Sequence, residues 1–442
     1  MQKMSLQEAL GQSGGPMELL WRPNAPAHAV PVVPPEIEGW RKEQTAWATG
    51  VAYFEMSHHM TDLVVEGPDA EKLLSYVSAN NFSKFRVGQA KQFVAVSEDG
   101  FLIQDGIMTK TAEDRFAVIG NGVAANWLLY HASDRTYDAR LILDPDSQFR
   151  GSPPAQFRFQ VQGPKAMPLL ERAFGAPLPE IKFFHFAEVS LAGKGFYALR
   201  HGMAGQPGFE FFGNWSDYEA IRDRIFEVGA EFGLVQVGGL AYFTTGVASG
   251  WLATPVPAIY TSESTAKYRE FVSLYSYEGM NKLHGSFYSE NVEDYYVSPY
   301  ELGYGRSISF DHEFIGREAL LSSSKKRHRK KVTLVWNSED VANVFGSERE
   351  YFNSYSRDRV ESDGELVGIS EYSSYFEYAG RIFSIARVDP EVAKPGSQVN
   401  VVWGEHPGPG ADAAVLDSFP RIRAEVQPAP IDEFARTTYR NN

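Results

Sequence analysis

The run Asp62-Leu63-Val64-Val65-Glu66-Gly67-Pro68-Asp69-Ala70 joins a strand to a helix within one short segment. Residues 62–66 are apolar and β-branched at their centre, which is typical of a strand, and Gly67-Pro68 is a turn signal. A helix is expected over residues 69–78. The segments that follow repeat this mixture, with strands expected at 91–96, 106–110, 115–119 and 140–143 and a helix at 124–132. The interleaving indicates an α+β fold rather than a strict βαβ repeat.

Two further regions lie beyond a Pro- and Gly-containing linker at 145–156. The first is again mixed, with strands expected at 157–161 and 195–199 and helices at 164–173 and 217–232. The second is rich in short strands, at 332–336, 366–370, 381–388 and 398–403, which is the pattern of a small β-barrel or sandwich. The expected division is an N-terminal arm (1–35), a first α+β lobe (36–150), a second α+β lobe (151–324), a basic linker (325–331), a C-terminal β-barrel (332–430) and a tail (431–442).

Two boundary features support this division. The arm ends in a Pro-rich stretch, and a helix is expected to start at Pro35, because Trp40 and Trp47 lie seven residues apart and can dock one helical face on the core. The basic run 325–331 is interpreted as a solvated linker between domains rather than a nuclear or nucleic-acid signal.

The composition excludes several classes of function. The 442 residues contain no cysteine, which rules out disulfides, thiolate metal sites and a cysteine nucleophile. The formal net charge of −14 disfavours general binding to DNA or RNA. No signal peptide and no apolar segment of the ~20 residues that span a bilayer is recognised, so we expect a soluble cytoplasmic protein with no membrane partner.

The motif Gly120-Asn121-Gly122-Val123-Ala124-Ala125 matches a dinucleotide-binding fingerprint with Ala in the third place. Its glycines could let backbone amides approach a pyrophosphate. However, Asp144, at the position of a ribose ligand, is followed directly by proline. A structural strand-to-helix turn is therefore favoured, and a nucleotide-dependent oxidoreductase that uses this loop is kept as an alternative function.

No metal site is predicted. The adjacent pair His58-His59 lacks the i, i+4 spacing of helical ligands, and neither a zincin motif nor a nucleophile elbow occurs. The pair ends a strand-like segment, so a functional role for one member stays open, and the role of His58 is undecided.

Seven short motifs, in order along the chain, resemble the landmarks of the glycine-cleavage T-protein (aminomethyltransferase) superfamily. They are YFEMSHHM at 53–60, LVVEGPDA at 63–70, GFLIQDG at 100–106, FQVQGP at 159–164, GQPGFE at 205–210, LGYG at 302–305 and FIGREAL at 314–320. Within it the chain is most similar to tetrahydrofolate-dependent aryl O-demethylases of the vanillate and syringate type, through AANW at 124–127, KFFH at 182–185, RHGMAG at 200–205, SGW at 249–251, PVPAIY at 255–260 and NVEDYY at 291–296.

The resemblance implies a clover-leaf of two α+β folate-binding lobes and a C-terminal β-barrel, with tetrahydrofolate as the methyl acceptor. It implies that Glu210 binds the pterin, that Gln160 and Gln162, which flank the family's Gln-Gly-Pro turn, are further cofactor-binding residues, and that Phe183 and Trp251 are the candidate stacking residues. A pterin has a flat ring and a donor–acceptor edge, which suits aromatic, carboxylate and amide side chains.

The resemblance also has departures that bear on the substrate. Gln104-Asp105 stands where amine-directed members carry two Asp, which points away from aminomethyl chemistry and towards ethers. The vanillate and syringate enzymes have an Arg where this chain has Asn121, and tyrosines where it has His28 and Val30. We expect a pocket shaped by His28, Val30, Met56 and Asn121 that accepts a methoxylated aromatic acid, with a chlorinated dicamba-type methoxybenzoate as a serious candidate.

The family position that donates a proton to the departing phenolate matches Tyr242, and His59 matches a second polar residue of the same pocket. The predicted function is transfer of a methyl group from a methoxyaromatic acid to tetrahydrofolate, giving a phenol and 5-methyltetrahydrofolate. A non-catalytic folate-binding accessory protein of the same superfamily is the other alternative.

Overall fold

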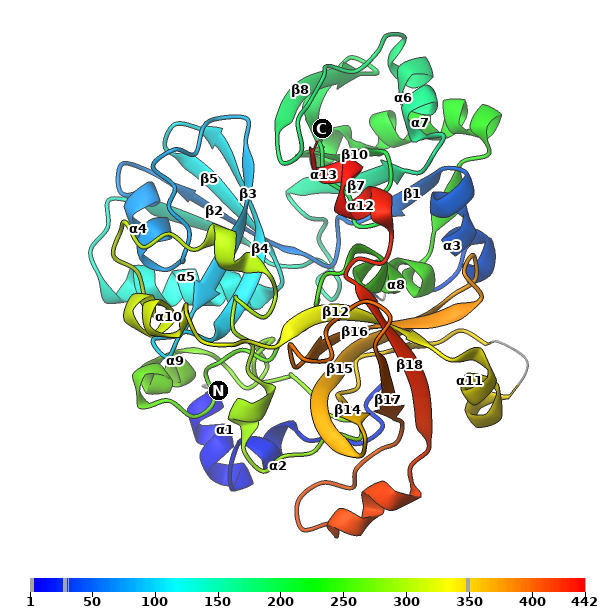
Figure 1. The fold of residues 1–442 in the computed structure, drawn as a ribbon. Coiled ribbons are helices and arrows are strands. Elements are labelled where there is room, and N and C mark those ends of the chain that lie inside the picture. The colour runs from blue at the N-terminus through cyan, green and yellow to red at the C-terminus, as the bar shows by residue number, and fades with distance from the viewer. Residues whose placement is uncertain (1–3, 27–29, 31, 347–349, 442) are drawn as a thin grey trace.

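The computed structural model describes residues 4–26, 30, 32–346 and 350–441 of the chain. Three sheets, each with its own helices, surround a central region (Figure 1). The expected α+β architecture with a C-terminal β-barrel is confirmed.

The first sheet carries the segment 61–66 at its centre. All its strands pair antiparallel, in the order β3 (Ala90–Val96), β4 (Leu102–Ala112), β5 (Arg115–Gly120), β2 (Thr61–Glu66) and β6 (Arg140–Asp144). Helices α4 (Ala70–Tyr76) and α5 (Gly122–Asp134) bury apolar side chains in the core of this sheet, among them Leu73, Leu74 and Leu128. Gly67 forms the turn into α4 at φ +125°, where an added Cβ would lie 2.7 Å from the carbonyl oxygen of Asp138.

The N-terminal arm is more structured than its sequence indicated. It contains α1 (Leu6–Ser13) and α2 (Pro16–Leu20), which share the apolar core of the first sheet with α9 (Ala266–Phe271). Helix α3 (Trp40–Thr49) does carry both tryptophans, but it starts after Gly39 and not at Pro35.

The second sheet has the order β11 (Val235–Val237), β1 (Ala52–Glu55), β7 (Gln156–Gln162), β10 (Gly208–Asn214), β9 (Lys194–Leu199) and β8 (Phe186–Leu191). On one face, aromatic residues of β7 and β10 pack with helices α6 (Ala166–Phe174) and α7 (Tyr218–Phe232) in an apolar core. The other face is directed towards the centre of the molecule, where α3 and α8 (Gly239–Ser249) lie. The two faces follow from the two-residue period of the strands.

The third sheet closes into a six-stranded barrel with a short seventh strand at its edge. The closed order is β15 (Glu365–Phe376), β14 (Asp358–Ser362), β17 (Gln398–Val402), β18 (Arg421–Pro428), β12 (Lys330–Trp336) and β16 (Arg381–Val388), with β16 pairing back to β15 and β13 (Asn353–Ser354) added to β15. Helices α10 (Arg317–Ser323) and α11 (Ser338–Phe345) flank β12 in the sequence, and Lys330 and Lys331 of the basic run already belong to that strand.

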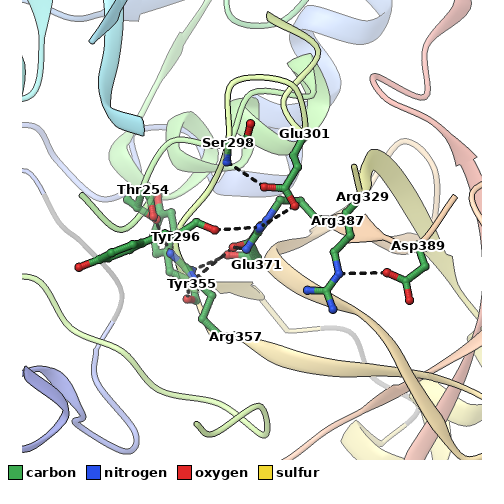
Figure 2. A network of polar contacts seen from close by, with 10 residues as sticks. All are labelled: Thr254, Tyr296, Ser298, Glu301, Arg329, Tyr355, Arg357, Glu371, Arg387 and Asp389. Atoms are coloured by element: carbon green, nitrogen blue, oxygen red, sulfur yellow. Dashed lines mark hydrogen bonds and ion pairs between the residues drawn. The ribbon is translucent and has the colours of Figure 1, made fainter. Parts of the chain in front are cut away.

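A buried ion network joins the barrel to the loops that follow α8 (Figure 2). Nε of Arg387 lies 2.7 Å from Glu371, and Nη1 of the same residue lies 3.3 Å from Glu301. Arg357 donates to the carbonyl oxygens of Glu371 at 2.8 Å and Thr254 at 2.5 Å. Removing one partner from such a buried network leaves an uncompensated charge, so the barrel and these loops are expected to stay together.

The chain ends back at the centre. After β18 it forms α12 (Glu433–Arg436) and α13 (Thr438–Asn441), which lie beside β7 and β10 (Figure 1). The approach is close, because a Cβ on Gly205 would lie 2.7 Å from that of Ala435.

Candidate active site

Strand β7 carries buried polar residues on the face opposite its apolar core. Along this strand Phe157, Phe159 and Val161 enter the apolar core, while Arg158, Gln160 and Gln162 alternate with them and face the other way. All three polar side chains are buried. A strand with one apolar face and one buried polar face indicates a site, because buried polar groups need partners.

Glu210 lies directly across the ladder from Gln160. Nε2 of Gln160 donates to Oε2 of Glu210 at 2.8 Å, and Nε of Arg158 lies 3.1 Å from Oε1. The backbone amide of Met203 donates to Oε1 of Gln160 at 3.0 Å, which fixes the direction of that carboxamide. The structure therefore brings Glu210 and Gln160 into direct contact.

Gln162 and Phe183 lie next to this pair, under the C-terminal helix. Nε2 of Gln162 donates to the carbonyl oxygen of His201 at 3.2 Å, whereas its buried Oε1 has no hydrogen-bond partner among the described residues. The ring of Phe183 is 5.6 Å from that of Tyr439, a buried residue of α13. The orphaned amide oxygen and the neighbouring rings fit a flat ligand with a hydrogen-bond donor at its edge.

Trp251 is held by the carboxylate of Asp105, a residue predicted only to mark a departure from the amine-directed family members. Its indole N–H donates to Oδ2 of Asp105 at 2.9 Å, and the same oxygen accepts from Tyr304 at 2.6 Å and from Gln92 at 2.8 Å. Burial raises the pKa of Asp105, while the hydrogen bonds from Tyr304 and Trp251 oppose that rise. Asp105 and Tyr304 thus hold the predicted cofactor residue Trp251 in place, although neither was predicted as a site residue and both fall inside matched motifs.

His59 and Tyr242 form a direct pair. His59 follows β1, Tyr242 lies in the first turns of α8, and Nε2 of the imidazole is 2.9 Å from the phenol oxygen. Burial and the charge of Glu210 raise the pKa of Tyr242. The phenol therefore keeps its proton at neutral pH and is available as a donor within the field of Glu210.

The predicted substrate residues are less closely grouped. His28 lies outside the described residues. Val30 and Met56 are buried, and Met56 belongs to the apolar cluster that Tyr242 contacts. Asn121 caps helix α5, because its Oδ1 accepts from the amide of Val123 at 3.0 Å. The assignment of the four residues to a substrate pocket stays a prediction.

The glycine loop at 120–122 serves the fold. It joins β5 to α5 in an antiparallel sheet, whereas the dinucleotide fingerprint belongs to a parallel βαβ unit. Asp144 accepts from the amide of Ala155 at 2.7 Å and pairs with Arg150 at 2.7 Å, so it is engaged within its own loop. The turn interpretation of the loop agrees with both observations.

His58 points away from the pair formed by its neighbour. Its Nδ1 lies 2.8 Å from Ser147 Oγ, its ring contacts Trp215 edge-on, and burial lowers its pKa. Among the described residues, no group of three or more His, Asp or Glu side chains is arranged to hold a metal ion. In the same part of the chain, no helix has the length and apolar character needed to cross a membrane.

Comparisons with known proteins agree with this arrangement. A family model described as the GCVT N-terminal domain matches residues 19–252. The chain is 37% identical to a syringate O-demethylase of Sphingobium sp., over 98% of this chain and 97% of that protein. It is 30% identical to a sesamin methylene transferase of Sinomonas sp., over 77% and 78% of the two chains. The glycine cleavage system aminomethyltransferase T from Bartonella henselae has a similar fold, with a TM-score of 0.62 and 18% identity over 89% of this chain and 90% of that one.

Proposed function

Because this chain belongs to the GCVT family, which includes the aminomethyltransferases, we propose that it is a tetrahydrofolate-dependent O-demethylase. It transfers a methyl group from a methoxylated aromatic acid to tetrahydrofolate, giving a phenol and 5-methyltetrahydrofolate. The observation that carries the proposal is the His59–Tyr242 pair, which lies within the field of Glu210, the proposed pterin ligand. The reaction needs a proton donor for the departing oxygen and a protein carboxylate that binds the pterin of tetrahydrofolate.

Glu210 accepts hydrogen bonds from the pterin edge, and Gln160 holds the carboxylate in place. Oε1 of Gln162 accepts a further donor, and Trp251 and Phe183 contact the ring faces. Asp105 orients Trp251 through the indole N–H. Tetrahydrofolate supplies a secondary amine nitrogen, whose lone pair accepts the methyl group.

In the reaction, the bond between the ether oxygen and the methyl carbon breaks and a nitrogen–carbon bond forms. The amine nitrogen releases its proton, and the phenolate oxygen gains one, so the two products together hold the same atoms as the two substrates. Tyr242 donates to the oxygen on which negative charge develops, and His59, 2.9 Å from the phenol, orients it and can return its proton.

The proposed substrate is a methoxybenzoate other than vanillate. The relative named for syringate shows that the fold can act on a methoxyaromatic acid. With Asn121 where the vanillate and syringate enzymes carry Arg, the substrate carboxylate lacks that cation, and a buried carboxylate without a cation or several donors is costly. A ring with its carboxylate elsewhere, as in dicamba, avoids this cost.

No contact among the described residues favours either alternative function. The antiparallel sheet around Gly120 argues against the oxidoreductase, and the Tyr242–His59 pair would have no purpose in an accessory protein that only binds folate. Incubation with tetrahydrofolate and a panel of methoxybenzoates, followed by mass spectrometry for the phenol, separates the three. The oxidoreductase would instead need a nicotinamide or flavin, and the accessory protein would release no phenol.

A further inference from the structure

Arg158 is a buried cation whose side chain joins two elements of the proposed site. Its Nε lies 3.1 Å from Glu210 on β10, and its two Nη atoms lie 3.3 and 3.4 Å from the carboxylate of Asp62 on β2. The exposed fraction of Arg158 is 3%. One guanidinium therefore serves two carboxylates in a place where water cannot replace it.

The backbone of Arg158 is tied to the segment that leads to His59. Its carbonyl oxygen accepts from the amide of Met56 at 2.9 Å, and its amide donates to Oγ of Ser57 at 2.9 Å. Asp62 lies three residues beyond His59 in the sequence. Arg158 thus contacts Glu210, the proposed pterin ligand, and it also contacts both ends of the segment that carries His59, the proposed catalytic histidine.

We propose that Arg158 is a positioning residue that holds the Glu210 carboxylate as an acceptor for tetrahydrofolate at a fixed place relative to His59 and Tyr242. This inference rests on the proposed function. Without the guanidinium, Glu210 keeps only the hydrogen bond from Gln160. Its carboxylate then loses the contact that fixes it as an acceptor for the ligand.

The titratable side chains around Glu210 are Asp62, Arg158, His201, Tyr242 and Tyr439. Burial lowers the pKa of His201 and raises those of both tyrosines, and each of these shifts favours the neutral form of the side chain. Among the described residues, Arg158 is the cation that forms an ion pair with Glu210.

The variant that isolates the effect is Arg158→Met combined with Asp62→Asn. It removes one cation and one of its two carboxylates, so the formal charge of the cluster is unchanged and only the pairing of Glu210 is lost. We expect the Kd for tetrahydrofolate, measured by calorimetry, to rise about 10- to 100-fold at pH 7. KM for tetrahydrofolate should rise in parallel, with KM for the methoxyarene nearly unchanged.

Two single variants keep the test sound if the double variant does not fold. Arg158→Lys keeps the charge but not the forked guanidinium, so it should recover part of the affinity for tetrahydrofolate. Asp62→Asn leaves the contact between Arg158 and Glu210 in place, so its Kd should stay within about threefold of wild type. The control is Arg359→Met with Glu361→Gln, which removes an ion pair of the barrel with a 2.7 Å contact. It should lower stability and leave the Kd for tetrahydrofolate at its wild-type value.

The outcomes distinguish the inference from the proposal beneath it. If wild-type protein binds tetrahydrofolate and the Arg158 variants bind it equally well, Arg158 is only structural and the inference is overturned. If wild-type protein does not bind tetrahydrofolate, the proposed function itself fails, and the inference fails with it.

Discussion

Replacing Tyr242 with phenylalanine removes one oxygen atom from the proposed site. The lost phenol lies 2.9 Å from His59, and burial together with the charge of Glu210 raises its pKa, so it acts as a donor throughout the neutral range. A positioned proton donor contributes roughly 10²–10⁴ in rate, or about 3 to 5 kcal/mol of barrier. We expect kcat for methyl transfer to fall by that factor while the Kd for tetrahydrofolate stays within about threefold, because Tyr242 is not a folate ligand in the proposed site.

The assay is single-turnover formation of the phenol over a series of methoxybenzoates whose phenols differ in acidity. The loss caused by Tyr242→Phe should shrink as the phenol becomes more acidic, because a better leaving group needs less help. Tyr351→Phe is a matched control, since that hydroxyl donates to the carbonyl oxygen of Leu240 on the same helix at 2.9 Å. Equal losses across the series would show that Tyr242 only packs, and wild-type turnover in the variant would remove it from the mechanism.

Three further predictions follow from other parts of the structure. Glu210→Ala should weaken tetrahydrofolate binding by about 1–3 kcal/mol or more in calorimetry, because the pterin donors lose their acceptor; unchanged affinity would refute the assignment. Burial raises the pKa of Asp358 from 3.8 to about 7, so the folded state binds its proton more tightly than the unfolded state does. The resulting stabilisation is full below about pH 4 and is lost as the pH rises through 7, which lowers the free energy of unfolding by up to about 4 kcal/mol. Asp358→Asn should therefore lose less Tm than wild type between pH 5 and 8, and parallel profiles would contradict this. Asn121→Arg should raise kcat/KM for vanillate, although loss of the cap on α5 costs about 1 kcal/mol of stability; no gain with vanillate would show that the carboxylate is seated elsewhere.

Much of the fold was accessible from the sequence because its signals are local. The strands at 61–66 and 115–120 and the helix at 218–232 have the expected apolar periodicity and clear turn residues. Helices α1 and α2 were missed although local signals were present. Ser5 and Glu8 form a capping box at the start of α1, and Pro16 is the first residue of α2.

The residues of the candidate site also fall into two groups, those that the sequence predicted and those that it did not. Glu210, Gln160, His59 and Tyr242 were predicted from the family resemblance. In the structure Gln160 contacts Glu210, and His59 contacts Tyr242. Arg158 was not found, although a signal was present in the alternation of Phe157, Phe159 and Val161 with three polar residues. The role of Asp105 depends on Trp251 and Tyr304, which are more than a hundred residues away, so no local pattern could reveal it.

The central claim is that the methyl group of an aryl ether is transferred intact to folate. The most direct measurement uses a methoxybenzoate panel labelled with a trideuterated methoxy group, with purified protein and tetrahydrofolate, and mass spectrometry of both products. The account predicts one trideuterated 5-methyltetrahydrofolate for each phenol formed, with at least one panel member turned over faster than vanillate. Phenol formed without label on the folate, or no phenol from any member of the panel, would contradict it.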